Sequence, residues 1–192
     1  MAMWTIESEK ADDAPEIEAL IARSFGPGRY AKSAYRLREG VDEVKPLSFV
    51  AREEGKLRGS VRFWPVKIGV EPALILGPLA VEPEQRGRGI GIELMKRGIE
   101  AAKKAGHSLI ILVGDLDYYQ RVGFARVTEG QMKFPGPVDQ ARVLALELKP
   151  GALARAQGPV LRPHLDHPVA AGGAPLSYVS APLGAPGGED EA

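Results

Sequence analysis

The sequence contains no cysteine, which excludes a disulfide bond, a thiolate metal site and a cysteine nucleophile. It has no excess charge either: 25 Lys and Arg stand against 25 Asp and Glu, so no global field attracts nucleic acid or a membrane surface. No apolar run approaches the roughly 20 residues that span a bilayer, and segment 1–10 carries acids in place of the apolar core of a signal peptide. We therefore expect a cytoplasmic protein that binds neither nucleic acid nor membrane.

Metal ligands are also scarce. His164 and His167 lie near Asp166, but histidines in a proline-rich segment are more often solvated surface than ligands. His107 follows a helix-ending glycine, where an imidazole usually serves as a charge at a helix C-terminus. We expect no metal.

The 192 residues suit one domain with a sizeable core, because 44% of them are hydrophobic. The segment after Pro150 becomes rich in Gly, Pro and Ala and has little periodicity. We therefore expect a domain over residues 1–165 and an extended or disordered tail over residues 166–192.

Periodicity and turn signals predict the order of the elements. The expected elements are a strand at 3–7, a helix from Asp12 or Asp13 to Ser24, a helix at 30–39, hairpin strands at 47–52 and 57–68, a buried strand at 73–81, a helix at 89–105 and a strand at 108–113. The last three form a right-handed parallel βαβ unit. Gly98, inside the long helix, predicts close packing against the sheet.

Pro78 stands within the buried strand at 73–81. Proline has no N–H to donate, so it predicts a bulge or an interruption of strand pairing. A strand boundary at Pro78 is the alternative.

The loop Arg86-Gly-Arg-Gly-Ile-Gly91 lies between that strand and the next helix. Unpaired N–H groups at a helix N-terminus, glycines that admit a bulky anion and two arginines together predict a phosphate or pyrophosphate site. The glycine spacing fits neither the dinucleotide motif, whose third glycine position holds Ile92, nor the P-loop. The alternative is a glycine-rich turn that only packs the helix on the sheet.

This loop resembles the [RQ]-x-x-G-x-[GA] signature of the GCN5-related N-acetyltransferase (GNAT) superfamily. Residues 114–124, Gly-Asp-Leu-Asp-Tyr-Tyr-Gln-Arg-Val-Gly-Phe, resemble its Y-x-x-x-G-F element, and more narrowly the YhbS-like branch. That branch also has a strand like 143–148 followed by P-G-A-L. The resemblance covers roughly residues 3–160.

The resemblance implies an α/β fold of the acyl-CoA N-acyltransferase type, with a mixed sheet whose central strand pair splays apart. It implies that acetyl-CoA is the acyl donor. Its pyrophosphate would be held by Arg86, Gly87, Arg88, Gly89, Ile90 and Gly91, and its pantetheine arm would pair with the free edge at Leu79, Ala80 and Val81.

The chemistry needs an acid for the departing thiolate and a base for the amine. The resemblance gives Tyr119 the role of acid; the alternative is a core aromatic, and Tyr118 is expected to pack. An N–H from 79–81 would stabilise the oxyanion. An alkylammonium of pKa about 10.4 must lose a proton, and Glu82, directly after the strand, is the candidate base. Asp115 and Asp117 are the other candidates, and a plain surface role is the alternative for Glu82.

Two functions are therefore open: an acetyl-CoA-dependent N-acetyltransferase acting through a ternary complex, and a non-catalytic acyl-CoA-binding sensor or partner-binding module. The glycine spacing disfavours a third, nucleotide binding. The sequence does not identify the amine acceptor, although Phe25, Arg29, Tyr30 and Trp64 could line its pocket. Either a monomer or a homodimer is compatible with the sequence.

Overall fold

The computed structural model describes residues 3–166, apart from the side chains of Tyr30 and Ala31. Of the tail predicted at residues 166–192, the structure describes only Asp166; the rest, including His167, lies outside the described residues. Asp166, which we assigned to the tail, is only 6% exposed. Its carboxylate accepts hydrogen bonds from the Arg162 backbone N–H at 2.9 Å and from Arg162 Nε at 3.1 Å. The packed part of the chain therefore includes this residue.

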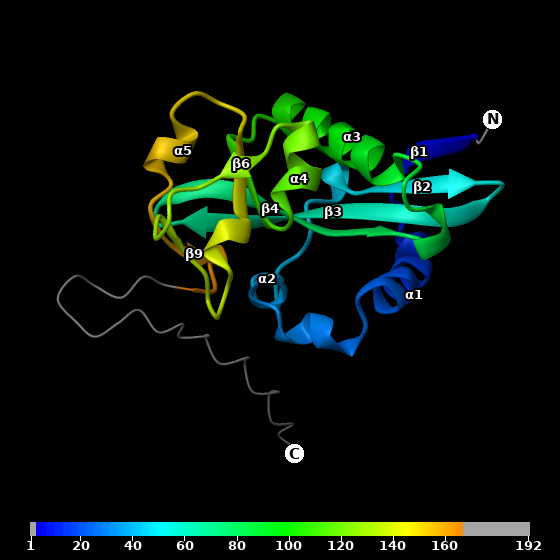
Figure 1. The fold of residues 1–192 in the computed structure, drawn as a ribbon, viewed down its shortest axis with the longest axis horizontal. Coiled ribbons are helices and arrows are strands. Elements are labelled where there is room, and N and C mark those ends of the chain that lie inside the picture. Colours follow the sequence, from blue (N-terminus) through cyan, green and yellow to red (C-terminus); the bar gives the residue numbers. More distant parts are fainter. Residues whose placement is uncertain (1–2, 167–192) are drawn as a thin grey trace, which may run out of the picture.

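A mixed sheet forms the centre of the molecule (Figure 1). Its main path runs β1-β2-β3-β4-β5-β8-β6, and along this path only β4 and β5 pair in parallel. Among the described residues two further strands lie off the path, where β9 pairs with β3 and with β7. The strands are β1 Trp4–Ser8, β2 Phe49–Glu53, β3 Lys56–Ile68, β4 Glu71–Val81, β5 Leu109–Val113, β6 Ala125–Arg126, β7 Met132–Lys133, β8 Val143–Glu147 and β9 Gly158–Leu161.

Helices cover both faces of this sheet. Figure 1 shows α3 on one face and α1 and α2 on the other. The helices are α1 Ala14–Phe25, α2 Ser33–Arg36, α3 Ile90–Lys104, α4 Leu116–Tyr119 and α5 Ala152–Arg155. Within residues 3–166 no helix has the length and apolar character needed to cross a membrane. The α/β mixed-sheet prediction is confirmed.

The predicted helix at 30–39 is wrong. The chain forms a 3-10 turn at Pro27–Ala31 and then only the single-turn helix α2. Lys32 between them is extended, with φ −72° and ψ 138°, so the helical hydrogen bonds cannot continue through it. The irregular backbone that begins after α1, at Gly26 and Pro27, therefore reaches as far as Lys32.

Separate apolar clusters attach the helices to the sheet. Side chains of α3, including Leu94 and Met95, pack with Phe63 and Leu112 on one face. On the other face, Ile17 and Leu20 of α1 pack against Val50 and Ala80. The apolar side of α3 is thus buried, and burial of such a side is the main source of helix stability in a folded domain.

The predicted irregularity at Pro78 is confirmed. The antiparallel register of β3 and β4 pairs Val61 with Leu79 but Phe63 with Leu76, so β4 carries an extra residue at Gly77 and Pro78. The Gly77 carbonyl accepts a hydrogen bond of 2.6 Å from Trp64 Nε1. The bulge is therefore fixed from β3.

Gly98 makes the close packing that its position predicts. A Cβ added there would lie 2.3 Å from Cε2 of Phe63 and 2.6 Å from Cζ. Phe63 is fully buried, so its ring has little room to withdraw. A glycine is consequently required where α3 crosses β3.

We expect Gly98→Ala to lower the free energy of unfolding by about 1 kcal/mol, measured by urea denaturation. Overpacking lowers the free energy of unfolding by about 1–3 kcal/mol, and the better helix propensity of alanine offsets up to about 1 kcal/mol of this loss. In a Phe63→Leu background the same change should be neutral or stabilising, since the clash is gone. Equal effects in the two backgrounds would contradict the contact.

Candidate functional site

The parallel strands β4 and β5 separate at their carboxyl ends. Their pairing is confined to Leu74 with Ile110 and Ile75 with Ile111, whereas β4 continues to Val81. Beyond this point one edge of β4 is hydrogen-bonded to β3 and the other is not paired with β5. The separation that we expected is confirmed, and it leaves backbone groups of β4 available to a ligand.

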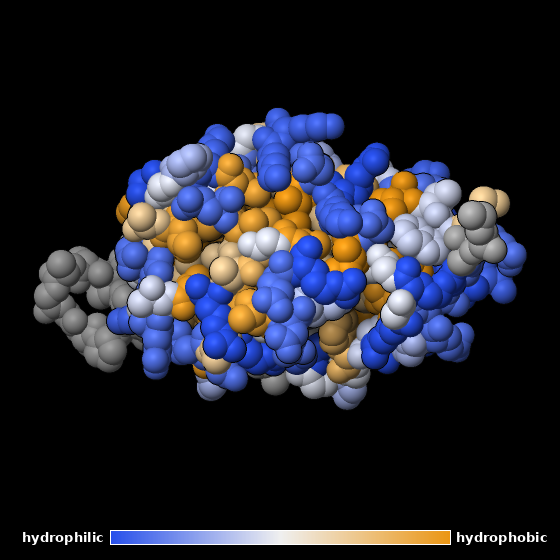
Figure 2. Space-filling view, turned by 45° about the horizontal axis from the view of Figure 1, so that its top comes forward, coloured by the Kyte–Doolittle hydropathy of each residue, from blue (hydrophilic) through white to orange (hydrophobic). Residues whose placement is uncertain are grey.

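Half-buried apolar side chains lie at this separation. Leu79 and Val81 of β4 and Leu116 of α4 contact the core cluster without being enclosed by it. Figure 2, turned so that the α3 side comes forward, shows apolar residues gathered across the middle of the face among charged side chains. Such a surface suits the uncharged arm of an amphipathic ligand.

The N-terminus of α3 has open backbone donors. Gly89 is the N-cap residue, and no side chain caps the helix within the described residues. The first intrahelical bond joins Glu93 N to the Gly89 carbonyl at 3.1 Å, so the N–H groups of residues 90–92 have no helical partner. Gly87 and Gly89 have φ of +84° and +86°, which glycine adopts without strain. This geometry suits an anion.

The two arginines of the loop differ in their surroundings. Arg86 is exposed. Arg88 donates from Nη2 to Glu53 at 2.8 Å and also contacts Gln85. The hydrogen bond with Arg88 lowers the pKa of Glu53, and the same bond raises the pKa of Arg88. Arg86 is thus the cation that can turn toward an anion, and Arg88 is tied to the β2–β3 hairpin.

Tyr118 lies against the first turn of α3. A Cβ added to Gly91 would lie 2.2 Å from the Tyr118 hydroxyl and 3.6 Å from Cδ2 of Leu79. Burial raises the pKa of Tyr118. Its ring meets that of Tyr119 edge-on, with centroids 5.1 Å apart. The packing that we expected of Tyr118 is what the structure describes.

Tyr119 lines a cavity of about 460 Å³. Burial is the largest of the effects that raise its pKa to about 12, followed by the neighbouring Tyr118 and Asp115. The phenol therefore stays protonated at neutral pH and can donate a hydrogen bond into the cavity. The Tyr119 ring packs on Gly114: a Cβ added to this glycine would lie 2.3 Å from Cε2 of Tyr119.

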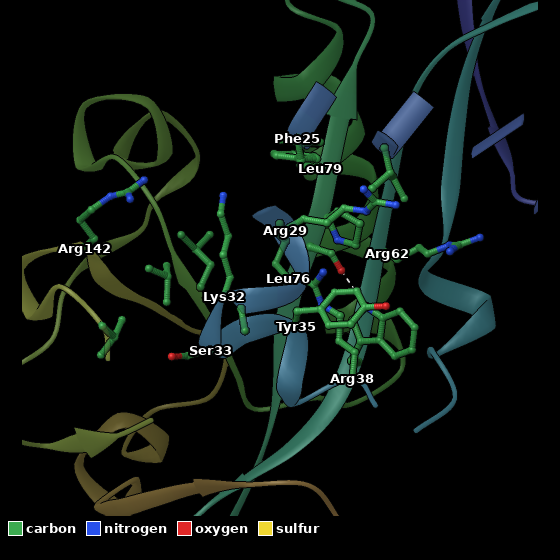
Figure 3. Close-up of a pocket in the computed structure, with 18 of the residues that line it drawn as sticks. Phe25, Arg29, Lys32, Ser33, Tyr35, Arg38, Arg62, Leu76, Leu79 and Arg142 are labelled. Atoms are coloured by element: carbon green, nitrogen blue, oxygen red, sulfur yellow. Dashed lines mark hydrogen bonds between the residues drawn. The ribbon is translucent and has the colours of Figure 1, made fainter. Parts of the chain in front are cut away.

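The cavity reaches from α1 and α2 to the β4 bulge (Figure 3). Phe25, Arg29 and Trp64, which we expected around a common pocket, all line it. The side chain of Tyr30 lies outside the described residues. Gly77, Pro78 and Leu79 of β4 form part of the wall beside Tyr119. The cavity thus adjoins the strand edge that β5 leaves open.

The carboxylates predicted as bases lie elsewhere. Glu82 Oε1 accepts a hydrogen bond of 2.5 Å from Arg23 Nη2, and Glu82 is not among the residues that line the cavity. Asp115 pairs with Arg142 at 3.3 Å, and Asp117 is exposed. The role of Glu82 stays a prediction.

Sequence reasoning named Arg29 but missed Arg62 and Arg38, two further charged residues of the cavity wall. Arg62 is 7% exposed and is paired with Glu9, with N–O distances of 2.8 and 3.0 Å. A charge within the apolar run 61–66 was a signal for such a buried pair. Arg38 also lines the cavity, and nothing in the local pattern distinguishes it from a surface arginine.

No group of three or more potential ligands that could hold a metal ion occurs among residues 3–166.

Comparison with known families matches residues 14–124 to the acetyltransferase (GNAT) family. The uncharacterised N-acetyltransferase YhbS of Escherichia coli is 37% identical over 115 residues, which make up 58% of this chain and 68% of that protein. YjhQ of Escherichia coli, also an uncharacterised N-acetyltransferase, is 33% identical over 138 residues, or 70% of this chain and 76% of the relative.

Two solved structures extend the similarity to the fold. The GNAT family N-acetyltransferase YhbS from Escherichia coli, in complex with CoA, superposes with a TM-score of 0.72 at 29% identity, covering 84% of this chain and 91% of that one. A GNAT family acetyltransferase from Brucella melitensis, in complex with acetyl-CoA, gives a TM-score of 0.62 at 30% identity, covering 84% and 96%.

Proposed function

Because the chain belongs to the acetyltransferase (GNAT) family, we propose that it is an acetyl-CoA-dependent N-acetyltransferase that acts by direct attack in a ternary complex. One structural observation carries the proposal: the open edge of β4 lies between the uncapped N-terminus of α3 and the cavity that Tyr119 lines. An acyl donor fits this arrangement if its anionic end lies at the N-terminus of α3, its arm follows β4 and its reactive end reaches the cavity. The relatives crystallised with CoA and acetyl-CoA support the same donor.

In the proposed complex the pyrophosphate lies on the N–H groups of the loop from Gly87 to Gly91, with Arg86 adding charge. The pantetheine arm follows the open edge of β4 along Leu79, Ala80 and Val81. The thioester then reaches the end of the cavity where Tyr119 and Leu79 lie.

The reaction proceeds through one tetrahedral intermediate. The neutral amine nitrogen forms a bond to the thioester carbon, and the carbonyl oxygen becomes an oxyanion that a β4 N–H stabilises. Collapse of the intermediate breaks the carbon–sulfur bond, and the sulfur leaves with the electron pair. The amide and CoA are the products: the nitrogen gives one proton to the base before it attacks and loses a second proton as the intermediate collapses, and the sulfur gains one proton.

Tyr119 is the proposed donor to the leaving sulfur. A thiol of pKa about 8.5 is more acidic than a phenol whose pKa is about 12. The phenol therefore acts through the hydrogen bond that it donates to the leaving thiolate, and the thiolate takes its proton from water, because a thiol of pKa about 8.5 is mostly neutral at pH 7.

Glu82 is the proposed base. Its position directly after β4 supports this role, and because Arg23 holds its carboxylate, it would take the proton through water. We expect Glu82→Gln to lower kcat/KM about tenfold at pH 7, below the usual range for a directly placed base, because water relays the proton. The loss should shrink toward pH 10, where the amine is already neutral. A loss that is constant with pH would contradict the role.

The proposed activity can be tested by release of CoA. A panel of amines and peptides is incubated with acetyl-CoA and a thiol-reactive dye, and since the chain has no cysteine, any thiol that appears is CoA. Amine-dependent release supports the proposal. A melting temperature that acetyl-CoA raises without release by any amine would favour the acyl-CoA-binding sensor.

A further inference from the structure

Arg38, in the wall of the cavity, forms no ion pair with any side chain that the structure describes. Its Nε is buried and has no hydrogen-bond partner, and no described side chain forms an ion pair with its guanidinium. Desolvation by burial lowers the pKa of Arg38 to about 10, opposed by Tyr35, so the group keeps its charge at neutral pH. Figure 3 shows Arg38 close to Tyr35 and apart from Arg142.

The other described cations of the cavity are already engaged. Arg62 is paired with Glu9 and Glu18, and Arg142 with Asp115. Lys32 lies over the Phe25 ring, 5.4 Å from its centroid, and Arg29 Nη1 donates to the Gly26 carbonyl at 2.6 Å. Of the carboxylates in the wall, Glu18 is taken by Arg62, and Asp139 accepts from the Ala141 N–H at 3.0 Å. The third, Glu39, is exposed and forms no ion pair with Arg38 in the described part of the chain. Nothing described in the free protein compensates Arg38.

A buried charge without a counterion is costly, and its cost is recovered when an anion binds. The planar guanidinium presents a fork of donors that matches a carboxylate or phosphate. An amine acceptor enters this same cavity under the proposed function. The missing counterion is therefore best supplied by the acceptor itself.

The position of Arg38 sets the size of such an acceptor. A Cβ at Gly77 would lie 2.6 Å from Arg38 Nη2, so the guanidinium rests directly on the bulge of β4. Leu79, where the proposed thioester lies, is two residues further on, at most about 7 Å along the chain. A molecule that reaches both places has only a few bonds between its amine and its anionic group.

We propose that the acceptor is a small amine that carries an oxyanionic group, in the first place a carboxylate, and that Arg38 binds this group and orients the nitrogen toward the thioester. This inference rests on the proposed acetyltransferase function. It assigns Arg38 to acceptor recognition, apart from the donor site at the Arg/Gly loop.

The test compares matched acceptors in the CoA-release assay. Glycine and lysine are paired with glycinamide and lysinamide, which keep the amine and lose the carboxylate. Phosphoethanolamine is paired with ethanolamine to separate a phosphate source from a carboxylate source. We expect each amino acid to exceed its amide in kcat/KM by at least about tenfold, as a charge-assisted, bidentate contact warrants. If only phosphoethanolamine is preferred over its uncharged partner, ethanolamine, the result would support recognition of an oxyanion by Arg38 and identify that oxyanion as a phosphate.

Arg38→Met should remove this preference while the melting temperature stays equal or rises, because the substitution removes a partly buried charge without a described counterion and keeps the volume. Arg38→Lys should restore part of the preference, since it keeps the charge without the fork. Arg36→Met is the control: Arg36 ends α2 two positions before Arg38, is exposed and does not line the cavity, so its loss should leave the preference unchanged. A lower melting temperature with an unchanged preference would make Arg38 a structural residue and overturn the inference.

Failure of the inference and failure of the proposed function are distinguishable. CoA release that is equal or faster with the uncharged amides overturns the inference and leaves the acetyltransferase intact. If acetyl-CoA binds but no amine releases CoA, the melting temperature of the acetyl-CoA complex is compared with each pair present, and equal shifts for acid and amide again overturn the inference. If acetyl-CoA does not bind, the proposed function fails and the inference fails with it.

Discussion

Gly89→Asp should abolish the rise in melting temperature that acetyl-CoA gives the wild-type protein. At a ligand concentration of 100 times Kd, binding to the native state adds about 2.7 kcal/mol of stability. For a domain of this size that corresponds to a shift of roughly 5–10 °C, measured by thermal denaturation with and without acetyl-CoA. The aspartate would place a carboxylate at the N-cap of α3, where the pyrophosphate is proposed to lie.

Gly89→Asn is the matched control. Asparagine has almost the shape of aspartate, and both tolerate the left-handed conformation that Gly89 adopts with φ +86°. No other atom lies within 4 Å of a Cβ placed there, so neither side chain disturbs the fold. The asparagine variant should keep a measurable shift. An undiminished shift in the aspartate variant would refute the anion site.

Tyr119→Phe should reduce kcat roughly a hundredfold and leave the affinity for acetyl-CoA nearly unchanged. Positioned acids contribute about 10²–10⁴-fold, and a weakly basic thiolate needs the lower part of that range. The hydroxyl acts on charge that develops only as the carbon–sulfur bond breaks, so its loss lowers turnover rather than binding. The measurement is steady-state CoA release on an acceptor that the panel identifies.

Tyr118→Phe is the control for this tyrosine. Its hydroxyl lies against Gly91 rather than in the cavity, so its removal should leave turnover almost unchanged. Because the pKa of Tyr119 is about 12 and the phenol must be protonated to donate, the wild-type kcat should show no Tyr119-dependent fall between pH 7 and 10. Full turnover in Tyr119→Phe, or a fall near pH 9 that this variant removes, would contradict the assignment.

Local patterns predicted the parts of the fold that local physics decides. The helix that begins at Gly89 carries an apolar stripe and glycines at its start, and the structure places α3 at Ile90–Lys104. Pro78 lacks a donor, and the structure has a bulge there. The segment at 30–39 failed because Lys32 takes an extended conformation that no helix signal in the sequence indicates.

In the candidate site, too, the features formed by neighbouring residues could be predicted from the sequence, and those formed by distant residues could not. The proposed anion loop is a continuous stretch of six residues, so the sequence alone could locate it; the positive φ values of Gly87 and Gly89 come from the structure. The burial of Arg38 depends on its approach to Gly77, 39 residues further along the chain, which no periodicity records. Likewise, the contact of Glu82 with Arg23 joins β4 to α1 and is invisible until the sheet is assembled.

The contacts of Arg88 with Glu53 and Gln85 have a consequence for the entropy of binding. They join the glycine loop to the β2–β3 hairpin in the protein without ligand, so the loop is already ordered when the donor arrives. A mobile loop would lose conformational freedom on closing around a pyrophosphate, and that loss would weaken the affinity. Because Arg88 restrains the loop already on folding, the proposed donor would lose less of its binding free energy to ordering of the loop.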